Sequence, residues 1–153
     1  MRWLRVTLIG LLLGLACAAA AAELFPGPPA EEGVPLYFSL EVRQKGHVVA
    51  RPQLLGASGH DVRAVLRSRD GAPRMELLLQ PTLRGTKVGL DMHVALPDEP
   101  GLGKSFSLRH AEEAQLKLGQ DVDVRVLAMR VQSPEFEAYM RNAPPPDEGP
   151  NRD

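Results

Sequence analysis

Apolar residues recur at every second position along most of the chain, and the longest such stretch is Met75–Leu96. Its apolar positions fall in two runs on either side of Gly85: Met75, Leu77 and Leu79, then Val88, Leu90, Met92, Val94 and Leu96. A period of two that continues across a glycine-containing turn is typical of an antiparallel hairpin with one buried face. We therefore expect Met75–Leu96 to form two paired strands.

Similar runs occur on both sides of this hairpin, at Leu36–Arg43, His47–Leu55, Val62–Arg67, Phe106–His110, Ala114–Leu118 and Val122–Val131. Turn signals separate them at intervals of about 8–14 residues. The pattern predicts an all-β fold of about seven or eight strands, either a small antiparallel sandwich or a partly open barrel. Pro52 lies within one run and lacks an amide hydrogen, so we expect that strand to be bulged or at a sheet edge.

Two segments of the domain have a different pattern. Ser133 followed by Pro134 is typical of a helix start, which predicts one or two helical turns over Pro134–Arg141. Pro97–Gly103 is rich in proline and glycine, and we expect it to be the longest and most mobile internal loop. Leu77–Leu79 and Val126–Leu127 place apolar residues on both strand faces. Such strands are either buried between two layers or part of an interaction surface, and we favour burial.

The N-terminus has the pattern of a secretory signal peptide. Arg2 and Arg5 flank an apolar run that ends at Leu15, and small residues follow to Ala22. The apolar run is shorter than the roughly 20 residues that a bilayer requires. We expect cleavage after Ala22, and a periplasmic or extracellular protein. The predicted organisation is a signal peptide (1–22), a flexible spacer (23–34), a β domain (35–140) and a disordered tail (141–153).

Cys17, the only cysteine, lies at the end of the apolar run. The alternative to cleavage after Ala22 is lipidation of Cys17, which would make the protein an outer-membrane lipoprotein and bring it to a membrane. Gly14 stands where lipoprotein signals usually carry leucine. If residues 1–22 are removed, no cysteine remains for a disulfide or for thiol chemistry.

The composition is that of one small globular domain, with 153 residues, 44% hydrophobic and 24% charged. Loss of Arg2 and Arg5 with the signal peptide leaves 16 basic and 19 acidic residues, a net charge of −3. A nucleic-acid-binding protein needs a basic face for the phosphates, so we expect no nucleic-acid partner.

Three residue groups have the composition of a reactive site without its spacing. Gly101–Ser105 resembles the end of a phosphate-binding loop, but Asp98 stands where the first glycine belongs, and a strand-like run follows. Ser58, His60 and Asp61 have the residue types of a hydrolytic triad, but lie too close together in one turn to act in series. The histidines, which show no paired ligand spacing, are His47, His60, His93 and His110.

We therefore predict no catalytic residue, metal ligand or cofactor. Metal sites can assemble across strands, so a site made by His93 and His110 with Asp91 remains an alternative. The outward carboxylates Glu41, Asp91 and Asp123 are better explained as solubilising charges than as an acid–base pair. Four outward arginines on the first three strands form a candidate interaction face if these strands are adjacent: Arg43, Arg51, Arg63 and Arg67.

Two segments resemble the core of the bacterial secretin family. Pro52-Gln53-Leu54, followed by the glycines at 56 and 59, is similar to its "P-x-L-x-x-x-x-G" hairpin. Pro81, a glycine turn and Val88–Met92 are similar to the strand pair that follows it. The resemblance covers about residues 50–94 and implies an exported antiparallel β fold. Val62 stands where the family has alanine, and the chain is too short for a secretin pore.

These observations favour an exported, non-enzymatic binding or assembly module of the bacterial cell envelope. It would use a strand edge or an outward face to contact another envelope protein. Two other functions remain open. One is a hydrolase or metal-dependent enzyme whose site assembles across strands. The other is an inhibitor or chaperone-like protein that presents the 97–104 loop.

Overall fold

The computed structural model describes residues 27–143, which form nine strands and one helix. The signal peptide, Cys17 and residues 144–153 lie outside the described residues. The elements are β1 (Pro35–Gln44), β2 (His47–Ala50), β3 (Gln53–Ala57), β4 (Val62–Arg67), β5 (Pro73–Arg84), β6 (Lys87–Leu96), β7 (Glu99–Arg109), β8 (Glu113–Leu118), β9 (Val122–Arg130) and α1 (Pro134–Asn142).

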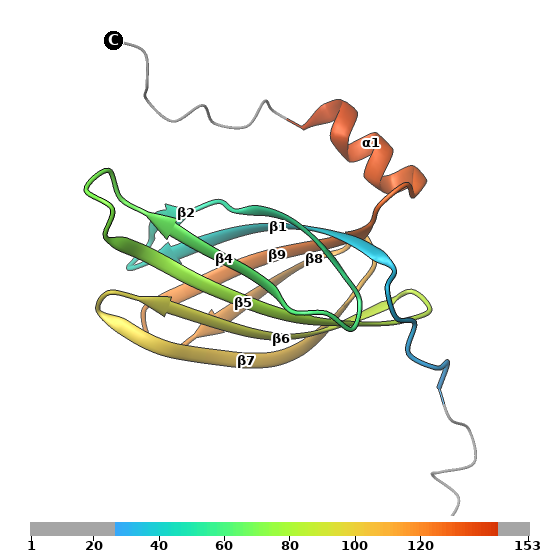
Figure 1. The fold of residues 1–153 in the computed structure, drawn as a ribbon, viewed down its shortest axis with the longest axis horizontal. Helices are drawn as coiled ribbons and strands as arrows, with labels where there is room; N and C mark the ends of the chain where they lie inside the picture. Colours follow the sequence, from blue (N-terminus) through green and yellow to red (C-terminus); the bar gives the residue numbers. More distant parts are fainter. Residues whose placement is uncertain (1–26, 144–153) are drawn as a thin grey trace, which may run out of the picture.

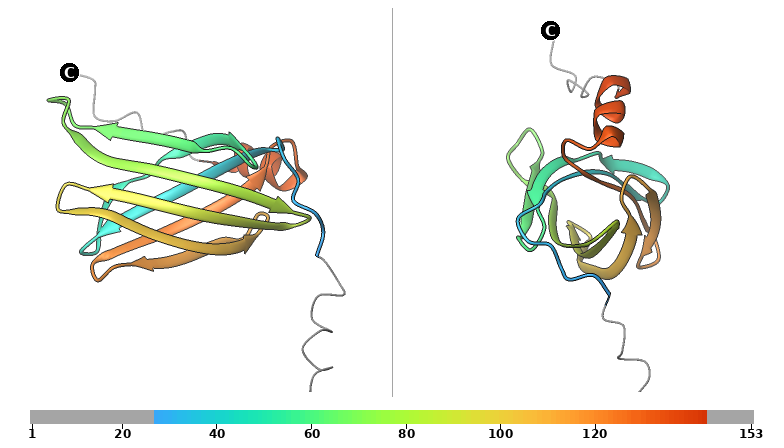
Figure 2. Two further views of the ribbon diagram at one scale, coloured as in Figure 1. Left: turned by 60° about the horizontal axis from the view of Figure 1, so that its bottom comes forward. Right: turned by 90° about the vertical axis from the view of Figure 1, so that its right-hand side faces the viewer.

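The strands form two antiparallel sheets that curve around one interior (Figures 1 and 2). The five-stranded sheet has the order β2-β1-β9-β8, with β3 also paired to β1, and the four-stranded sheet has the order β4-β5-β6-β7. The chain crosses from one sheet to the other between β3 and β4 and again between β7 and β8. No strand pairing closes these two seams in the described chain, so the fold is a partly open sandwich, as predicted.

The central hairpin is confirmed as β5 and β6. Leu79 lies opposite Met92 and Arg84 lies opposite Lys87, so the turn has only two residues. Gly85 in this turn has φ +60, a conformation that glycine adopts without strain. The expected inward residues are all buried, at 3% exposure or less.

The core lies between the sheets and takes the inward residues of both. On β1 and β9 large and small side chains face each other, for example Phe38 opposite Ala128. Pairing a large side chain with a small one lets the two strands share the interior at close packing, which is a main source of stability in a protein core. The described core residues of the five-stranded sheet are Leu36, Phe38, Leu40, Val42, Ala50, Leu118, Val122, Val124, Val126 and Ala128.

Pro52 lies at a sheet edge, as predicted. It separates β2 from β3, and both short strands pair with the same side of β1. The register is the same on both sides of Pro52, from Val42 opposite Ala50 to Ser39 opposite Gln53. The Pro52 carbonyl still accepts a hydrogen bond from the Leu40 amide (3.0 Å), so the edge stays attached where the proline has no hydrogen to donate.

The predicted loop over Pro97–Gly103 is wrong, because β7 begins at Glu99 and only Pro97 and Asp98 form the turn. A register shift between Val94 and Leu96 and a left-handed Gly101 (φ +83) let the strand continue through Pro100 and Gly101. Proline is tolerated on β7 because β7 is the last strand of its sheet. The hypothesis of a protruding 97–104 loop loses its basis.

The predicted spacer contributes its last residues to the domain. The Glu31 amide donates to the Leu83 carbonyl (2.7 Å), and the Ser58 amide donates to the Val34 carbonyl (3.0 Å). The Ser58 hydroxyl accepts from the Val34 amide (3.1 Å) and donates to the Glu31 carbonyl (2.5 Å). These contacts attach the end of the predicted spacer to the β domain.

The prediction that both faces of the Leu77–Leu79 strand are buried is wrong for its outward face. Leu78 points outward from the four-stranded sheet and remains half-buried. The five-stranded sheet differs, because α1 contacts the outward side of β9 and Met129, opposite Tyr37, is only 2% exposed.

Helix α1 begins and ends close to the prediction. The Ser133 hydroxyl accepts from the Phe136 amide (3.1 Å), and Pro134 occupies the first turn. Within residues 27–143 no helix has the length and apolar character needed to cross a membrane.

Candidate interaction face

The outward surface of the five-stranded sheet combines fixed charges, a covered aromatic cluster and exposed apolar side chains. We call it the five-strand face. Its members come from four strands, one connection and the helix: Tyr37, Ser39, Glu41, Arg43, Arg51, Gln53, Leu55, Glu113, Arg125, Leu127, Phe136, Tyr139 and Met140.

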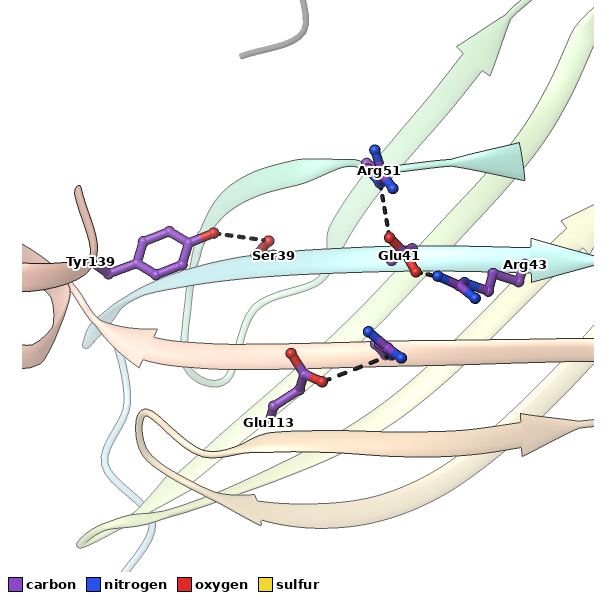
Figure 3. A network of polar contacts seen from close by, with 7 residues as sticks. Ser39, Glu41, Arg43, Arg51, Glu113 and Tyr139 are labelled. Carbon is purple, nitrogen blue, oxygen red and sulfur yellow. Dashed lines mark hydrogen bonds and ion pairs between the residues drawn. The ribbon is translucent and has the colours of Figure 1, made fainter. Parts of the chain in front are cut away.

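Glu41 is the centre of the charged part (Figure 3). Its two carboxylate oxygens accept from Arg43 Nε (2.6 Å) and Arg51 Nε (2.8 Å). The hydrogen bond from Arg43, and then that from Arg51, lowers the pKa of the Glu41 carboxyl. The carboxylate is thereby held in one orientation, although both arginines remain partly exposed.

Charges of opposite sign continue across the neighbouring strands. Arg125 on β9 lies opposite Glu41, and Asp123 lies opposite Arg43. Arg125 Nε also lies 4.0 Å from Glu113 Oε1 on β8. Cross-strand pairs of opposite charge stabilise a sheet, so this part of the face is a fixed array with little net charge.

Helix α1 covers the other part of the face. The rings of Phe136 and Tyr139 lie 5.5 and 5.7 Å from the ring of Tyr37, in tilted arrangements favourable for aromatic pairs. The Tyr139 hydroxyl donates to Ser39 Oγ (3.3 Å; Figure 3). Tyr37 is 5% exposed, and its hydroxyl has no hydrogen-bond partner among residues 27–143. Burial, with a smaller contribution from Tyr139, raises the pKa of Tyr37 to about 12.

Exposed apolar side chains lie beside this cluster. Leu55 on β3 lies opposite Tyr37 and is 69% exposed, and Met140 on α1 is 49% exposed. Large exposed apolar residues next to ordered aromatic and charged groups are typical of surfaces that bind another protein.

The four predicted arginines do not share one sheet. Arg43 and Arg51 belong to the five-strand face, whereas Arg63 and Arg67 lie on β4 in the other sheet. Arg63 pairs with Asp61 (3.1 Å) and Arg67 donates to the Gly71 carbonyl (3.0 Å). All four guanidinium groups therefore contact acceptors within the chain.

The candidate metal ligands lie apart. His93 and Asp91 point outward from β6, whereas His110 follows the far end of β7. His93 lies opposite Gly103 on β7, and Gly103 is seven residues before His110. Seven residues of extended strand span more than about 20 Å, so His93 and His110 are far apart. Glu41 lies in the other sheet. In the described chain no three His, Cys, Asp or Glu residues are placed to share a metal ion.

His110, a candidate metal ligand, and Ser58, from the triad-like turn, have structural roles that the sequence did not indicate. His110 Nδ1 accepts from the Arg130 amide (3.1 Å) and Nε2 lies 3.2 Å from Glu135 Oε2, which ties β7 to the start of α1. Ser58 is fully buried and holds the N-terminal segment, as described above. His60 and Asp61 are both exposed and make no contact with that hydroxyl.

The sequence prediction missed the aromatic cluster and Leu55. The only sequence signal was an outward aromatic position at Tyr37 and two aromatics three residues apart, at Phe136 and Tyr139. Residues three apart on a helix lie on the same side, so both rings face one way. This spacing does not predict which strand they contact.

Comparison of the chain with family models, with characterised proteins and with solved structures finds no match in any of the three. The resemblance of residues 50–94 to secretin segments stays a prediction.

Proposed function

We propose that this chain is an exported, non-enzymatic binding or assembly module of the bacterial cell envelope, and that it contacts another envelope protein through the five-strand face. The observation that carries the proposal is the position of exposed Leu55 beside the buried Tyr37 cluster and the Arg51–Glu41–Arg43 array. The N-terminal pattern of a signal peptide supports export.

The composition of this face favours a protein partner. Binding energy at protein interfaces concentrates in aromatic, arginine and large apolar side chains that lose water on contact. Leu55 and Met140 supply the apolar part, and the arginines supply directional donors at its border. Because the Glu41 array and the aromatic rings are already fixed by contacts within the chain, few side chains must be ordered on binding.

The direct test places a photo-crosslinking amino acid at Leu55 in cells that express the protein natively. Val65 is the matched control, since it is also apolar and 50% exposed but lies on β4 of the other sheet. We expect one discrete adduct at position 55, absent at position 65 and weakened by Arg51→Glu. No adduct at position 55, or equal adducts at both positions, would contradict the proposal.

Export is tested separately by mass spectrometry of the mature N-terminus. A chain that begins at Glu23 supports a soluble exported protein, and an acylated Cys17 supports the lipoprotein alternative. An unprocessed chain that begins at Met1 would contradict export.

A further inference from the structure

Three cations lie side by side at the end of the four-stranded sheet where β5 turns into β6. Arg84 lies opposite Lys87, and Lys87 lies opposite Arg109, so the three residues form one row across β5, β6 and β7 (Figure 2 shows these strands). All three side chains are exposed and on the outward side of the sheet. We call them the cation row.

Direct opposition of like charges destabilises paired strands. Elsewhere in the described strands, charged residues that lie directly opposite one another have opposite signs, as Arg43 with Asp123 and Glu41 with Arg125. Lys117 with Asp123 follows the same rule. The cation row is the exception among residues 27–143, and none of its side chains has an ion pair or hydrogen bond within the described chain.

The neighbouring positions leave room beside the row. Two residues further from the β5–β6 turn, on the same outward face, the neighbouring row consists of Thr82, Gly89 and Ser107. Gly89 therefore lies between two residues with hydroxyl groups. A side chain at Gly89 would place its Cβ 2.5 Å from Thr82 Oγ1, so the Thr82 side chain would have to move to accept one. A hollow of about 290 Å³ adjoins the row and is lined by Lys87, Ser107, Leu108, Arg109, Glu112, Glu113 and Ala114.

Nearby carboxylates do not neutralise the row. Glu31 accepts from the Gly85 amide (3.1 Å) but its other oxygen is taken by Arg130 (2.5 Å). Glu113 pairs with Arg125 at 4.0 Å. Glu112 lines the same hollow and has no ion pair with the row in the described chain.

From this geometry we propose that the cation row is an anion-binding site for a phosphate or sulfate group, with Arg84, Lys87 and Arg109 as the charged ligands and Ser107 as a hydroxyl donor. Lys87 and Arg109 line the hollow together with Ser107, and Arg84 lies next to Lys87 in the row. Adjacent cations favour a dianion over a single carboxylate. The group belongs either to a small soluble molecule or to a lipid headgroup. The three cations lie on the other sheet from the five-strand face, although Glu113 of that face lines the adjoining hollow. The proposal does not depend on the function proposed above.

The test follows amide chemical shifts in two-dimensional NMR spectra of the chain lacking residues 1–22, at constant ionic strength. Inorganic phosphate and sulfate are the probes, and acetate is the monovalent comparison. We expect saturable shifts confined to residues around 82–89 and 107–113, with weaker binding of acetate. Lys87→Gln, and independently Arg109→Gln, should weaken phosphate binding about three- to fivefold, the size expected of one exposed charge contact.

Lys117→Gln is the matched control, because it removes one exposed lysine from a strand of the other sheet. It should leave phosphate binding unchanged. Shifts that do not saturate, or equal affinities for the Lys87→Gln and Lys117→Gln variants, would overturn the proposal by showing general screening only. Sedimentation with vesicles that contain phosphatidylglycerol then distinguishes the sources. Lys87-dependent vesicle binding indicates a headgroup, and saturable phosphate binding without it indicates a soluble ligand.

Thermal unfolding supplies a second readout. If the row is held against charge repulsion, Lys87→Glu should raise the Tm by about 1 to 4 °C while phosphate binding is lost. A lower Tm in this variant would contradict the repulsion on which the proposal depends.

Discussion

The Tyr37 cluster gives a direct spectroscopic test of how α1 lies on the sheet. Tyr37 and Tyr139 are the only tyrosines, and the one tryptophan, Trp3, lies in the predicted signal peptide. Tyr139→Phe therefore leaves Tyr37 as the only group that contributes tyrosinate absorbance. Because burial is the main cause of its raised pKa, we expect this tyrosine to titrate well above 10 in the folded Tyr139→Phe protein and at about 10 in urea.

Linkage converts this shift into a pH dependence of stability. The pKa of Tyr37 is about 12 in the folded chain against 10 for an ordinary tyrosine. Its neutral form is therefore favoured by folding, and the corresponding stability is complete below pH 10 and is lost as the pH rises towards 12. Two pKa units correspond to about 2–3 kcal/mol of unfolding free energy, measurable by urea denaturation across this range.

Phe136→Ala tests whether α1 causes the burial. A nine-residue helix is too short to be stable without tertiary contacts, so removal of the ring that packs on Tyr37 should release α1. In the Tyr139→Phe background we expect the pKa of Tyr37 to fall towards 10 and helical circular dichroism to decrease. Met140→Ala, on the same helix but 49% exposed, should change neither. A tyrosine that titrates near 10 in the folded Tyr139→Phe protein would refute the reasoning.

Three further substitutions test contacts elsewhere. Ser58→Ala leaves two backbone groups of the N-terminal segment unpaired and should cost about 2–3 kcal/mol in urea unfolding, whereas exposed Ser107→Ala should cost almost nothing. Glu41→Gln removes two ion pairs and should cost about 0.5–1 kcal/mol at pH 7. The pKa of Glu41 is lowered, so this difference should be lost as the pH falls below 4.5. Gly56→Ala places a Cβ 2.2 Å from Val62 Cγ2 and should lower the Tm, with partial recovery in the Gly56→Ala, Val62→Ala double variant.

The strands were predictable because each needs only a local pattern. A period of two assigns the inward residues of β5 and β6 without knowledge of their partners, and it is confirmed at every inward position from Met75 to Leu96. The error at Pro97–Gly103 has a definite cause. Proline and glycine are normally taken as strand breakers, but an edge strand with a bulge tolerates both, and edge position is a property of the whole sheet.

The candidate site was not predictable for the same reason. The Tyr139 hydroxyl contacts Ser39, 100 residues earlier in the chain. Arg84 and Arg109 become neighbours of Lys87 only through the register of two strand pairs. A linear sequence gives the faces of strands but not which strands lie together, so functional surfaces built across strands appear only in the fold.

The arrangement of charges also separates the two proposed surfaces. With 18 basic and 19 acidic residues the composition is nearly neutral, which conceals opposite patterns on the two sheets. The five-strand face alternates its charges and exposes apolar groups, as protein interfaces do, whereas the cation row places like charges side by side with no ion pair to the described residues. The close-packed core lies between these sheets. A protein on the five-strand face and an anion at the cation row would therefore contact different sheets, and we expect substitutions at Glu41 and Lys87 to act additively.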